Sequence, residues 1–528
     1  MTQRPDFIPT LEQEVIRGAA QQRSGSVMVE AGAGCAKTST LELAAGQIRV
    51  PALALAFNKR IATDMQGRVP SSFSVKTMNG LGQSAWARVI SGASIRLDDR
   101  KLGKLVSEVA RQRRVELSSE QWDGLRLLTS KAMSSGLVPS SDPHGEASLI
   151  EDTKEGWRQV AEPLDLSPDD FELVWELARE VLVEDIRLAR EGVISFDDQI
   201  YCSTMLGGRF PQFPVVFVDE DQDLSPLNIR MVGQAIRPDG RLFAVGDKRQ
   251  AIYAWRGAAG DSAERLRSLM PLDSWKDYPL MTTFRCPKVV VERQQSHVPL
   301  FRAWHTNPEG RVYQLPLYSS DENQQGWDWG ELTKLLPSQT SPLAVLCRNN
   351  APLLSLAFKL LRRGIGCQML GRDIGKGLQV LAKRILPEDG TPAESCADKI
   401  EEWKQHEWSL ARANNSSEAK IESVLDRAEC LQAVLQSTEC RDAGGLRQML
   451  AKLFSRESDL ITLSSIHRAK GLEWDSVVHL DPWRIGLAAK RARARGDLVQ
   501  VEQEANLRYV AETRTKHTLV LANLENFR

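Results

Sequence analysis

The sequence lacks long apolar runs. In its 528 residues no stretch approaches the ~18–20 consecutive apolar residues of a membrane span. The N-terminal segment Met1–Asp6 also lacks the apolar core of a secretory signal. With 42% hydrophobic and 26% charged residues, the composition excludes collagen-like and wholly disordered proteins. We expect a soluble protein of three or four domains.

The sequence also lacks paired cysteines. Its eight cysteines are scattered, none forms a CxxC pair, and none lies near a histidine at metal-ligand spacing. This absence excludes a zinc site and a disulfide framework, and it indicates a reducing compartment. We therefore predict an intracellular protein. The cysteines are Cys35, Cys202, Cys286, Cys347, Cys367, Cys396, Cys430 and Cys440.

An excess of charge of one sign is missing as well. Sixty-eight basic residues stand against 69 acidic ones, which gives a net charge of −1. A protein that coats nucleic acid through its overall charge is therefore excluded, whereas binding along a local track is not. Residues 100–114 and 484–496 are locally basic. Such a run is either a solvated face or, as we hypothesise for residues 484–496, a contact to nucleic-acid phosphates.

One motif that is present has the order strand, small-residue loop, Lys-Thr and helix. Small residues let backbone N–H groups approach phosphate oxygens, and the start of a helix adds a favourable dipole. Lys37 is placed to reach the β- and γ-phosphates, and the Thr38 hydroxyl is placed to bind Mg²⁺. Ala31 and Ala36 stand where the usual pattern has glycine, so a plain small-residue turn is the alternative. The predicted phosphate-binding residues are Gly32, Ala33, Gly34, Cys35, Ala36, Lys37, Thr38 and Ser39.

A second apolar run, residues 214–218, leads into the acidic segment Asp219–Asp223. The run predicts a buried parallel strand, and open α/β sheets bind ligands at the carboxyl ends of such strands. Asp219 is placed to hold Mg²⁺, and Glu220 is placed to orient and deprotonate an attacking water. The alternative is a solvated acidic turn. A third candidate strand, residues 242–245, leads into Gly246–Gln250.

Together these segments resemble the UvrD/Rep/PcrA family of superfamily 1 DNA helicases. The acidic segment Asp219–Asp223 is close to the DExQD signature of the family, and residues 245–258 look like its third motif. Ser195–Asp198 and Gly371–Lys376 are also similar to the F-box DNA helicase branch and its phage and bacterial relatives, although no F-box fits before Gln13. Further segments match in the order of the family: Thr10–Gln13, Ala56–Lys59, Val75–Gly80, Thr283–Pro287, Ser465–Trp474 and Tyr509–Lys516.

The resemblance implies an α/β protein with two RecA-like P-loop NTPase cores that bind ATP and Mg²⁺ between them. Gln13 would then read the adenine edge, Phe284 would stack on the base, and Glu473 would contact the ribose. Gln250 would sense the γ-phosphate. Arg285 and Arg514 would neutralise charge on the transferred phosphoryl group, with interdomain ion pairs as their alternative role.

The resemblance also implies a single-stranded DNA track. Phe57 and Trp255 match positions that stack on bases, although each is alternatively a core aromatic. Arg256, Asn58, Thr77 and His467 would contact the DNA backbone or couple DNA to the ATP site. Any nuclease or other repair protein would be a separate partner, because the chain ends soon after Lys516.

Long intervals between the motifs indicate that each core is interrupted by a mainly helical accessory subdomain. The predicted segments are 1–91, 193–275 and their insertion 92–192 for the first core, and 276–364, 456–528 and their insertion 365–455 for the second.

The predicted function is an ATP-dependent helicase or translocase on single-stranded and tailed duplex DNA. The resemblance implies that it runs 3′ to 5′ and serves repair, recombination or replication. It also implies a cytoplasmic protein of a bacterial or phage-infected cell, used at the nucleoid. Alternatives are a protein-stripping translocase with little unwinding, a DNA-sensing subunit of a repair or defence assembly, and a DNA-binding scaffold whose ATPase is crippled by Ala36.

Overall fold

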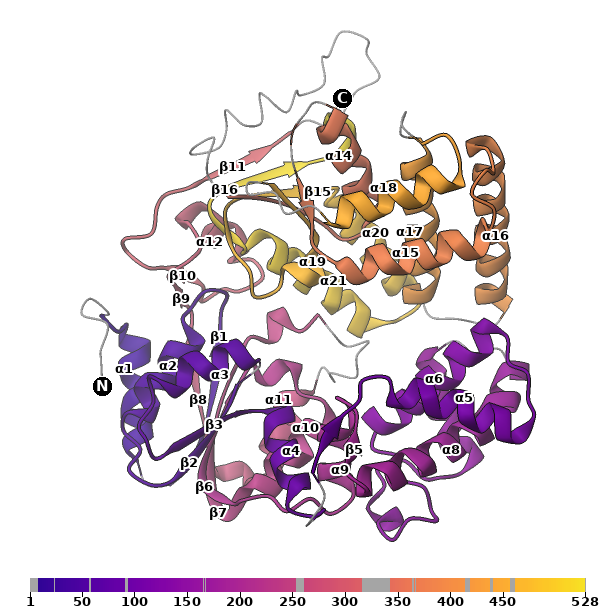
Figure 1. The fold of residues 1–528 in the computed structure, drawn as a ribbon. Helices are drawn as coiled ribbons and strands as arrows, with labels where there is room; N and C mark the ends of the chain where they lie inside the picture. Colours follow the sequence, from indigo (N-terminus) through magenta and orange to yellow (C-terminus); the bar gives the residue numbers. More distant parts are fainter. Residues whose placement is uncertain are drawn as a thin grey trace. The chain divides into compact units, whose positions relative to one another are not determined.

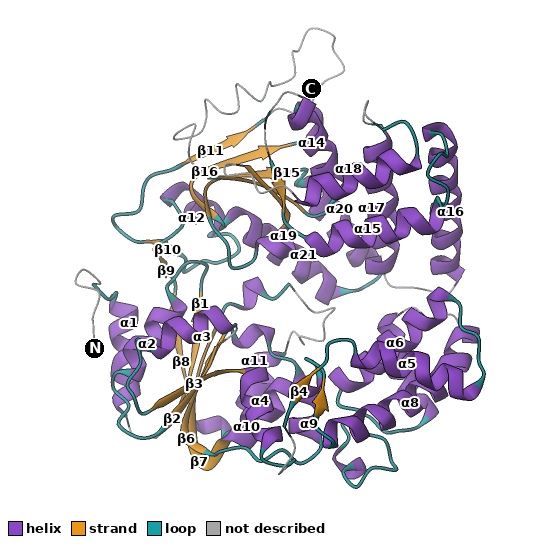
Figure 2. Cartoon of the chain, viewed as in Figure 1, coloured by secondary structure: helices purple, strands orange, loops and turns teal. Residues whose placement is uncertain are grey.

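The computed structural model describes residues 8–22, 24–56, 58–90, 94–164, 166, 168–252, 261–315, 342–362, 365, 367–413, 418–436, 440–455 and 461–527. The chain divides into two compact units. The first is Met1–Ala31 with Ala36–Leu280, and the second is Gly32–Cys35 with Met281–Arg528. Each unit is built around its own six-stranded sheet with flanking helices (Figures 1 and 2).

The sheet of the first unit has the strand order β3-β2-β6-β7-β1-β8, and its strand pairs are parallel. Its central strands are apolar because both faces of the sheet are covered, and every residue of β2 is buried. The predicted strands at 27–30, 214–218 and 242–245 are confirmed. The strands are β1 (Ser26–Ala31), β2 (Ala52–Ala56), β3 (Phe73–Thr77), β6 (Phe213–Asp219), β7 (Ile236–Gly246) and β8 (Trp275–Leu280).

Helices connect these strands, as parallel pairing requires. The predicted helix after the small-residue loop is confirmed as α2. The helices around this sheet are α1 (Leu11–Gln21), α2 (Lys37–Ala45), α3 (Lys59–Gln66), α4 (Met78–Ala87), α9 (Asp198–Met205), α10 (Pro226–Ala235) and α11 (Ser262–Arg267).

A helical region interrupts the first unit between two short parallel strands, and its buried apolar residues form one hydrophobic cluster with residues of α4, α9 and α10. Lys101, part of the basic run 100–114, does not face solvent. Its ammonium lies 3.0 Å from Asp185 and 2.7 Å from Asp198, and all three side chains are buried. This cluster joins α5 and α8 to the start of α9. The elements are β4 (Arg96–Leu97), α5 (Lys101–Arg113), α6 (Ser119–Ser134), α7 (Lys154–Ala161), α8 (Pro168–Arg190) and β5 (Val193–Ile194).

The second unit has a parallel sheet in the order β11-β16-β15-β12-β14-β13. Its strands are β11 (Arg311–Gln314), β12 (Leu343–Cys347), β13 (Gln368–Met369), β14 (Ile461–Ser465), β15 (Trp474–Leu480) and β16 (Thr515–Ala522). A separate short pair is β9 (Thr282–Thr283) with β10 (Arg302–Ala303). The helices are α12 (Lys288–Gln294), α14 (Ala351–Arg362), α19 (Ile466–Ala469), α20 (Trp483–Ala494) and α21 (Leu498–Glu512).

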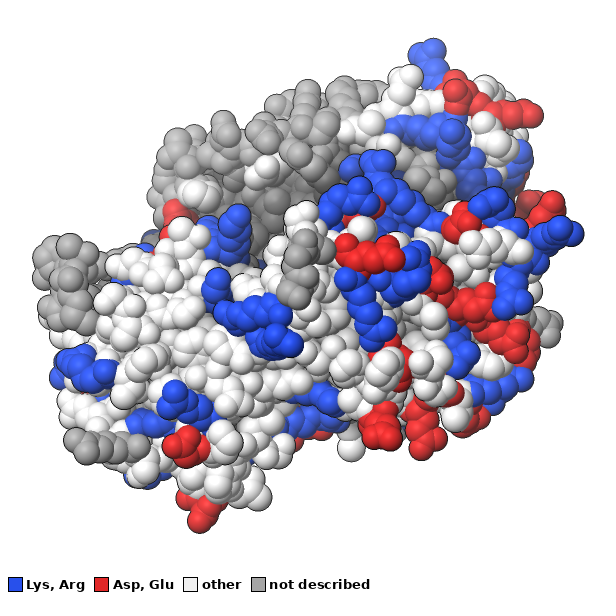
Figure 3. Space-filling model, turned by 60° about the horizontal axis from the view of Figure 1, so that its bottom comes forward, with Lys and Arg blue, Asp and Glu red and all other residues white. Residues whose placement is uncertain are grey.

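Four further helices lie between β13 and β14 of this sheet: α15 (Arg372–Ile385), α16 (Ala393–Ala413), α17 (Glu418–Leu435) and α18 (Ala443–Ser455). Together with the first unit, they confirm the predicted fold class of two RecA-like α/β cores with helical insertions. In the part of the chain that the structure describes, no helix combines the length and apolar character needed to cross a membrane. On the face drawn in Figure 3, basic and acidic side chains are interspersed and much of the surface is uncharged.

Candidate nucleotide and DNA sites

The loop between β1 and α2 has the backbone that a phosphate-binding loop needs. Gly34 lies in the left-handed region with φ of 71°, and Ala36 lies there too with φ of 59° and ψ of 46°. Ala36 therefore adopts the conformation that glycine would adopt in the usual motif, at a cost of roughly 1–2 kcal/mol for an L-residue with a Cβ. Ala33 and Cys35 are fully buried. Lys37 then begins α2.

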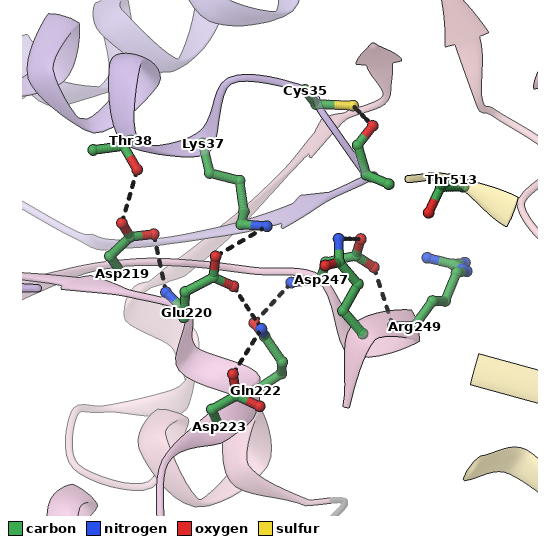
Figure 4. Close-up of polar contacts among 12 residues, drawn as sticks. Cys35, Lys37, Thr38, Asp219, Glu220, Gln222, Asp223, Asp247, Arg249 and Thr513 are labelled. Atoms are coloured by element: carbon green, nitrogen blue, oxygen red, sulfur yellow. Dashed lines mark hydrogen bonds and ion pairs between the residues drawn. The ribbon is translucent and has the colours of Figure 1, made fainter. Parts of the chain in front are cut away.

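The first turn of α2 faces the end of β6, as Figure 4 shows. The Thr38 hydroxyl donates a hydrogen bond of 2.9 Å to Asp219. The ammonium of Lys37 lies 3.4 Å from the carboxylate of Glu220. The predicted phosphate-binding and acidic residues, far apart in sequence, are thus brought together. Gly32 directly follows β1, and Ser39 lies in the first turn of α2.

The Thr38–Asp219 pair has the chemistry of a magnesium site. Mg²⁺ prefers hydroxyl and carboxylate oxygens, and both are present at the hydrogen-bonded pair. Burial raises the pKa of Asp219 to about 7, and the charge of Glu220 acts in the same direction. Burial likewise raises the pKa of Asp221 to about 7. A cation at Asp219 would relieve the cost of these buried charges, so the residues fit the metal.

Gln222 connects the acidic segment to the end of β7, a role that sequence reasoning missed. Its amide nitrogen donates to Glu220 over 2.6 Å, and its amide oxygen accepts from the backbone N–H of Asp247 over 2.9 Å. Asp247 in turn accepts a hydrogen bond of 2.6 Å from Gln250. The predicted water-orienting residue and the predicted γ-phosphate sensor therefore belong to one hydrogen-bonded chain. The only sequence signal was the place of Gln222 within the acidic segment.

Gly246 leaves room for this series of hydrogen bonds. A Cβ at Gly246 would collide with the carboxylate of Asp221 and the amide of Gln222. Because those two groups are buried beside the backbone of β7, a larger residue would push the acidic segment away from the phosphate loop.

Gln13 is fully buried and joins α1 to α2. Its amide donates a hydrogen bond of 2.9 Å to Thr40, and its amide oxygen accepts one of 3.0 Å from the backbone of Thr10. Gln13 thus closes a capping box at the start of α1. A primary amide has two N–H donors and two lone pairs, so these bonds use half of its capacity. The structure assigns it an anchoring contact, and adenine recognition stays a prediction.

In the second unit, three residues of the predicted motifs lie close together. The guanidinium of Arg285 lies 2.6 Å from the carboxylate of Glu473, which also lies 2.7 Å from the ammonium of Lys516. Burial raises the pKa of Glu473, but Arg285 and Lys516 lower it by more, so the carboxyl is held ionised. In this arrangement Glu473 neutralises Arg285.

Arg514 is 1% exposed. Its guanidinium donates to the carbonyl of Val510 over 3.1 Å and to the carbonyl of Leu472 over 3.3 Å, the latter being the residue before Glu473. Phe284 is partly buried, with its ring centroid 5.3 Å from that of Trp304.

The predicted DNA-contacting residues are only partly covered by the described chain. Phe57, Trp255 and Arg256 lie outside the described residues. Asn58 caps α3 shortly after β2, and Thr77, the last residue of β3, caps α4; the ends of β2 and β3 pair as neighbours. His467 lies in the short helix α19 after β14.

One exposed aromatic residue near this edge was not predicted to bind DNA. Phe196 is 62% exposed, and its carbonyl accepts a hydrogen bond of 3.0 Å from Asn79, two residues after Thr77. In the sequence, the segment Ser195–Asp198 stands out only for its family resemblance. Its proximity to Thr77 could not be read from the sequence, because more than a hundred residues separate the two.

The basic run at the C-terminal end of α20 is solvent-exposed: Lys490, Arg491, Arg493 and Arg495. Arg484, at the start of the same helix, instead pairs with Asp481 at 3.1 Å. The four exposed residues are therefore the candidates for the hypothesised contact to nucleic-acid phosphates.

Comparison with known proteins gives two family matches. Residues 187–270 match the UvrD/REP helicase N-terminal domain, and residues 394–526 match the UvrD-like helicase C-terminal domain. Across nearly the whole chain, relatives include the ATP-dependent DNA helicase UvrD2 of Mycobacterium tuberculosis (strain ATCC 25618 / H37Rv). It is 25% identical over 96% of this chain and 77% of its own length.

Two other relatives also align over nearly all of the chain. The ATP-dependent DNA helicase PcrA of Bacillus subtilis is 23% identical over 96% of this chain and 82% of its own length. The F-box DNA helicase protein 1 of Schizosaccharomyces pombe is 24% identical over 97% of this chain and 57% of its own length. With the two parallel-sheet units and the motif order, these matches show segments of both UvrD-like helicase domains in the chain, which is similar to the UvrD/Rep/PcrA-like helicases of superfamily 1.

Proposed function

We propose that the chain is an ATP-dependent DNA helicase or translocase that moves 3′ to 5′ on single-stranded DNA, in repair, recombination or replication. The observation that best supports this is the convergence of Lys37 and Thr38 with Asp219 and Glu220 at the end of a parallel sheet. The names of the relatives support ATP and DNA as its substrates. The polarity rests on the family resemblance.

The ATP chemistry follows from the positions of these side chains. Lys37 and the N–H groups of the loop bind the β- and γ-phosphates. Magnesium, when bound at Thr38 and Asp219, would neutralise charge on the phosphate oxygens. Glu220 takes a proton from the attacking water as its oxygen bonds to the γ-phosphorus, and the bond to the β–γ bridging oxygen breaks with its electron pair leaving on ADP.

The second unit contributes cations. We propose that Arg285 exchanges Glu473 for the γ-phosphate when ATP binds, and that Glu473 then contacts the ribose. Arg514 stabilises the charge that develops on the transferred phosphoryl group, a contribution that in related phosphoryl transfers is worth ~10³–10⁵ in rate. Phe284 stacks on the base, Gln13 reads the adenine edge, and Gln250 senses the γ-phosphate through its chain to Glu220.

We further propose that DNA lies along the edge formed by the ends of β2 and β3, with Asn58 and Thr77 at its backbone and Phe196 as a stacking surface. His467 would contact DNA in the second unit. The helical regions at 92–192 and 365–455 would act as accessory subdomains, and the segments 1–91 with 193–275, and 276–364 with 456–528, would form the two cores.

The proposal is tested by ATP hydrolysis with and without single-stranded DNA, together with unwinding of duplexes that carry a 3′ or a 5′ tail. We expect stimulation by DNA and unwinding of the 3′-tailed duplex. Lys37→Ala should abolish both activities, whereas Lys104→Ala, which removes an exposed lysine on α5, should keep them.

Each other outcome selects an alternative. Stimulated hydrolysis without unwinding of either duplex would indicate a protein-stripping translocase. DNA binding without hydrolysis in the unaltered chain would indicate a scaffold. Activity that survives in Lys37→Ala would overturn the assignment of the phosphate loop.

A further inference from the structure

The two segments that carry Arg285 and Arg514 touch each other beside these arginines. The thiol of Cys286, the residue after Arg285, donates to the carbonyl of Thr513, the residue before Arg514, over 3.6 Å. Both residues are buried, and burial raises the pKa of Cys286, so the thiol keeps the proton that it donates. The segments are 227 residues apart in sequence, so this spacing depends on tertiary contacts.

A stronger contact lies nearby. Glu512, the last residue of α21, accepts a hydrogen bond of 2.7 Å from Arg293 and one of 2.6 Å from Gln294. Both donors belong to α12, the helix that starts three residues after Arg285. The ring of His479, on β15, lies 3.9 Å from the same carboxylate. Glu512 therefore joins the helix that follows Arg285 to the helix that precedes Arg514.

The carboxylate of Glu512 is ionised where it lies. Its side chain is 2% exposed, and burial alone raises its pKa, but His479 and Arg293 lower the pKa by more. A buried carboxylate persists only when its oxygens are bonded, and here they are bonded to the two neighbouring side chains of α12. If this position only had to fill space in the core, an uncharged side chain would do so without burying a charge.

We propose that Glu512 is a positioning residue that holds Arg285 and Arg514 at a fixed spacing, so that the two guanidinium groups act on one phosphoryl group. The inference rests on the proposed function, which gives the two arginines that target. Without Glu512, the loop before α12 would be held to the end of α21 much less firmly, through the hydrogen bond between Cys286 and Thr513. Displacement of a catalytic group by about 1 Å can cost about 10²-fold in rate.

The first experiment replaces the carboxylate by an amide of the same shape. In Glu512→Gln we expect kcat for DNA-stimulated ATP hydrolysis to fall by about 10–100-fold. The KM for ATP and the affinity for single-stranded DNA should stay within about twofold, because the proposed role gives Glu512 no contact with either ligand.

The chain offers a matched control on the same helix. Glu504 of α21 is fully buried and accepts a hydrogen bond of 2.7 Å from Arg348, a residue that follows β12 and not the Arg285 segment. Glu504→Gln breaks a similar buried pair and should lower the melting temperature comparably, while kcat stays within about twofold. Equal losses of kcat in both variants would show a merely structural role, and an unchanged kcat in folded Glu512→Gln would also overturn the proposal.

Two further measurements separate this inference from the proposed function. In an Arg514→Ala background, Glu512→Gln should lower kcat little further, because the effects of substitutions at residues that act as a unit do not add up. Amide hydrogen exchange needs no activity: residues 283–287 and 512–516 should exchange faster together in Glu512→Gln but not in Glu504→Gln. If the unaltered chain shows no DNA-stimulated ATP hydrolysis, the proposed function fails, while slow exchange in both segments of Glu512→Gln would overturn the spacing role by itself.

Discussion

Replacing Ala36 by glycine tests how the phosphate loop is built. Ala36 has φ of 59° and ψ of 46°, a left-handed conformation that is unfavourable for a residue with a Cβ. The usual motif has glycine at this position, so Ala36→Gly should stabilise the first unit without moving the loop.

The size of the gain follows from two opposing contributions. The left-handed conformation costs alanine roughly 1–2 kcal/mol, which the variant recovers. Glycine is freer in the unfolded chain and loses about 0.5–1 kcal/mol of that gain. The net increase in the free energy of unfolding is therefore about 0–1.5 kcal/mol, centred near 0.75 kcal/mol. The central value corresponds to a melting temperature higher by about 1.5–3 °C in a domain of this size.

The assay is urea and thermal unfolding of Ala36→Gly beside Ala62→Gly. Ala62 lies inside α3, where the same chemical change should lower stability by about 1 kcal/mol. One substitution in two backbone conformations thus predicts opposite signs. Because Ala36 already holds the loop geometry, turnover of ATP in Ala36→Gly should stay within about threefold of the unaltered chain.

Two results would refute this reasoning. A loss of stability in Ala36→Gly would mean that Ala36 is not strained. A rise in turnover of more than about tenfold would mean that Ala36 distorts the loop and limits the enzyme, as the scaffold alternative requires.

Three other predictions follow from the structure. Burial and the charge of Asp198 raise the pKa of Asp185 well above its usual 3.8. The protonated carboxyl therefore contributes fully to the free energy of unfolding below pH 3.8, and this contribution declines as the pH rises through the raised pKa. Asp185→Asn cannot ionise and should flatten the decline of unfolding free energy toward alkaline pH, and an unchanged slope in urea titrations contradicts this. Phe196→Ala should weaken single-stranded DNA binding by about 5–150-fold in a fluorescence titration, since stacking is worth ~1–3 kcal/mol per base; unchanged binding removes Phe196 from the track. Neutralising the basic run at the end of α20 should make the plot of log K against log salt concentration shallower by about 0.7 for each phosphate that the run neutralises, and the same slope as the unaltered chain would refute the hypothesis.

Local patterns predicted the elements that hold the site. An apolar run followed by Lys-Thr or by an acidic segment specifies a buried strand and the side chains at its carboxyl end, as found for β1 with α2 and for β6. The parallel sheet then brings such strand ends to one edge, which is why Thr38 and Asp219 could be expected to meet.

Side-chain partners within the tertiary fold could not be predicted in this way. Gln222 lies in the acidic segment and Glu512 lies in the segment Tyr509–Lys516, but neither pattern predicts a partner. Their partners are 25 and 218 residues away in sequence and are set by tertiary packing. Lys101 belongs to a basic run in the sequence, yet helix packing turns it inward to Asp185 and Asp198. Ala36 led to the alternative of a scaffold with a crippled ATPase. A sequence does not show whether the surrounding residues hold a strained backbone in the conformation that the loop needs.

The central claim is that Glu220 takes the proton of the attacking water during DNA-stimulated ATP hydrolysis. Its most direct test is the turnover of Glu220→Gln compared with that of the unaltered chain, at saturating ATP and single-stranded DNA. We predict that the variant still binds both ligands while turnover falls by about 10²–10⁴-fold, the usual contribution of a general base. Turnover equal to that of the unaltered chain would contradict the account.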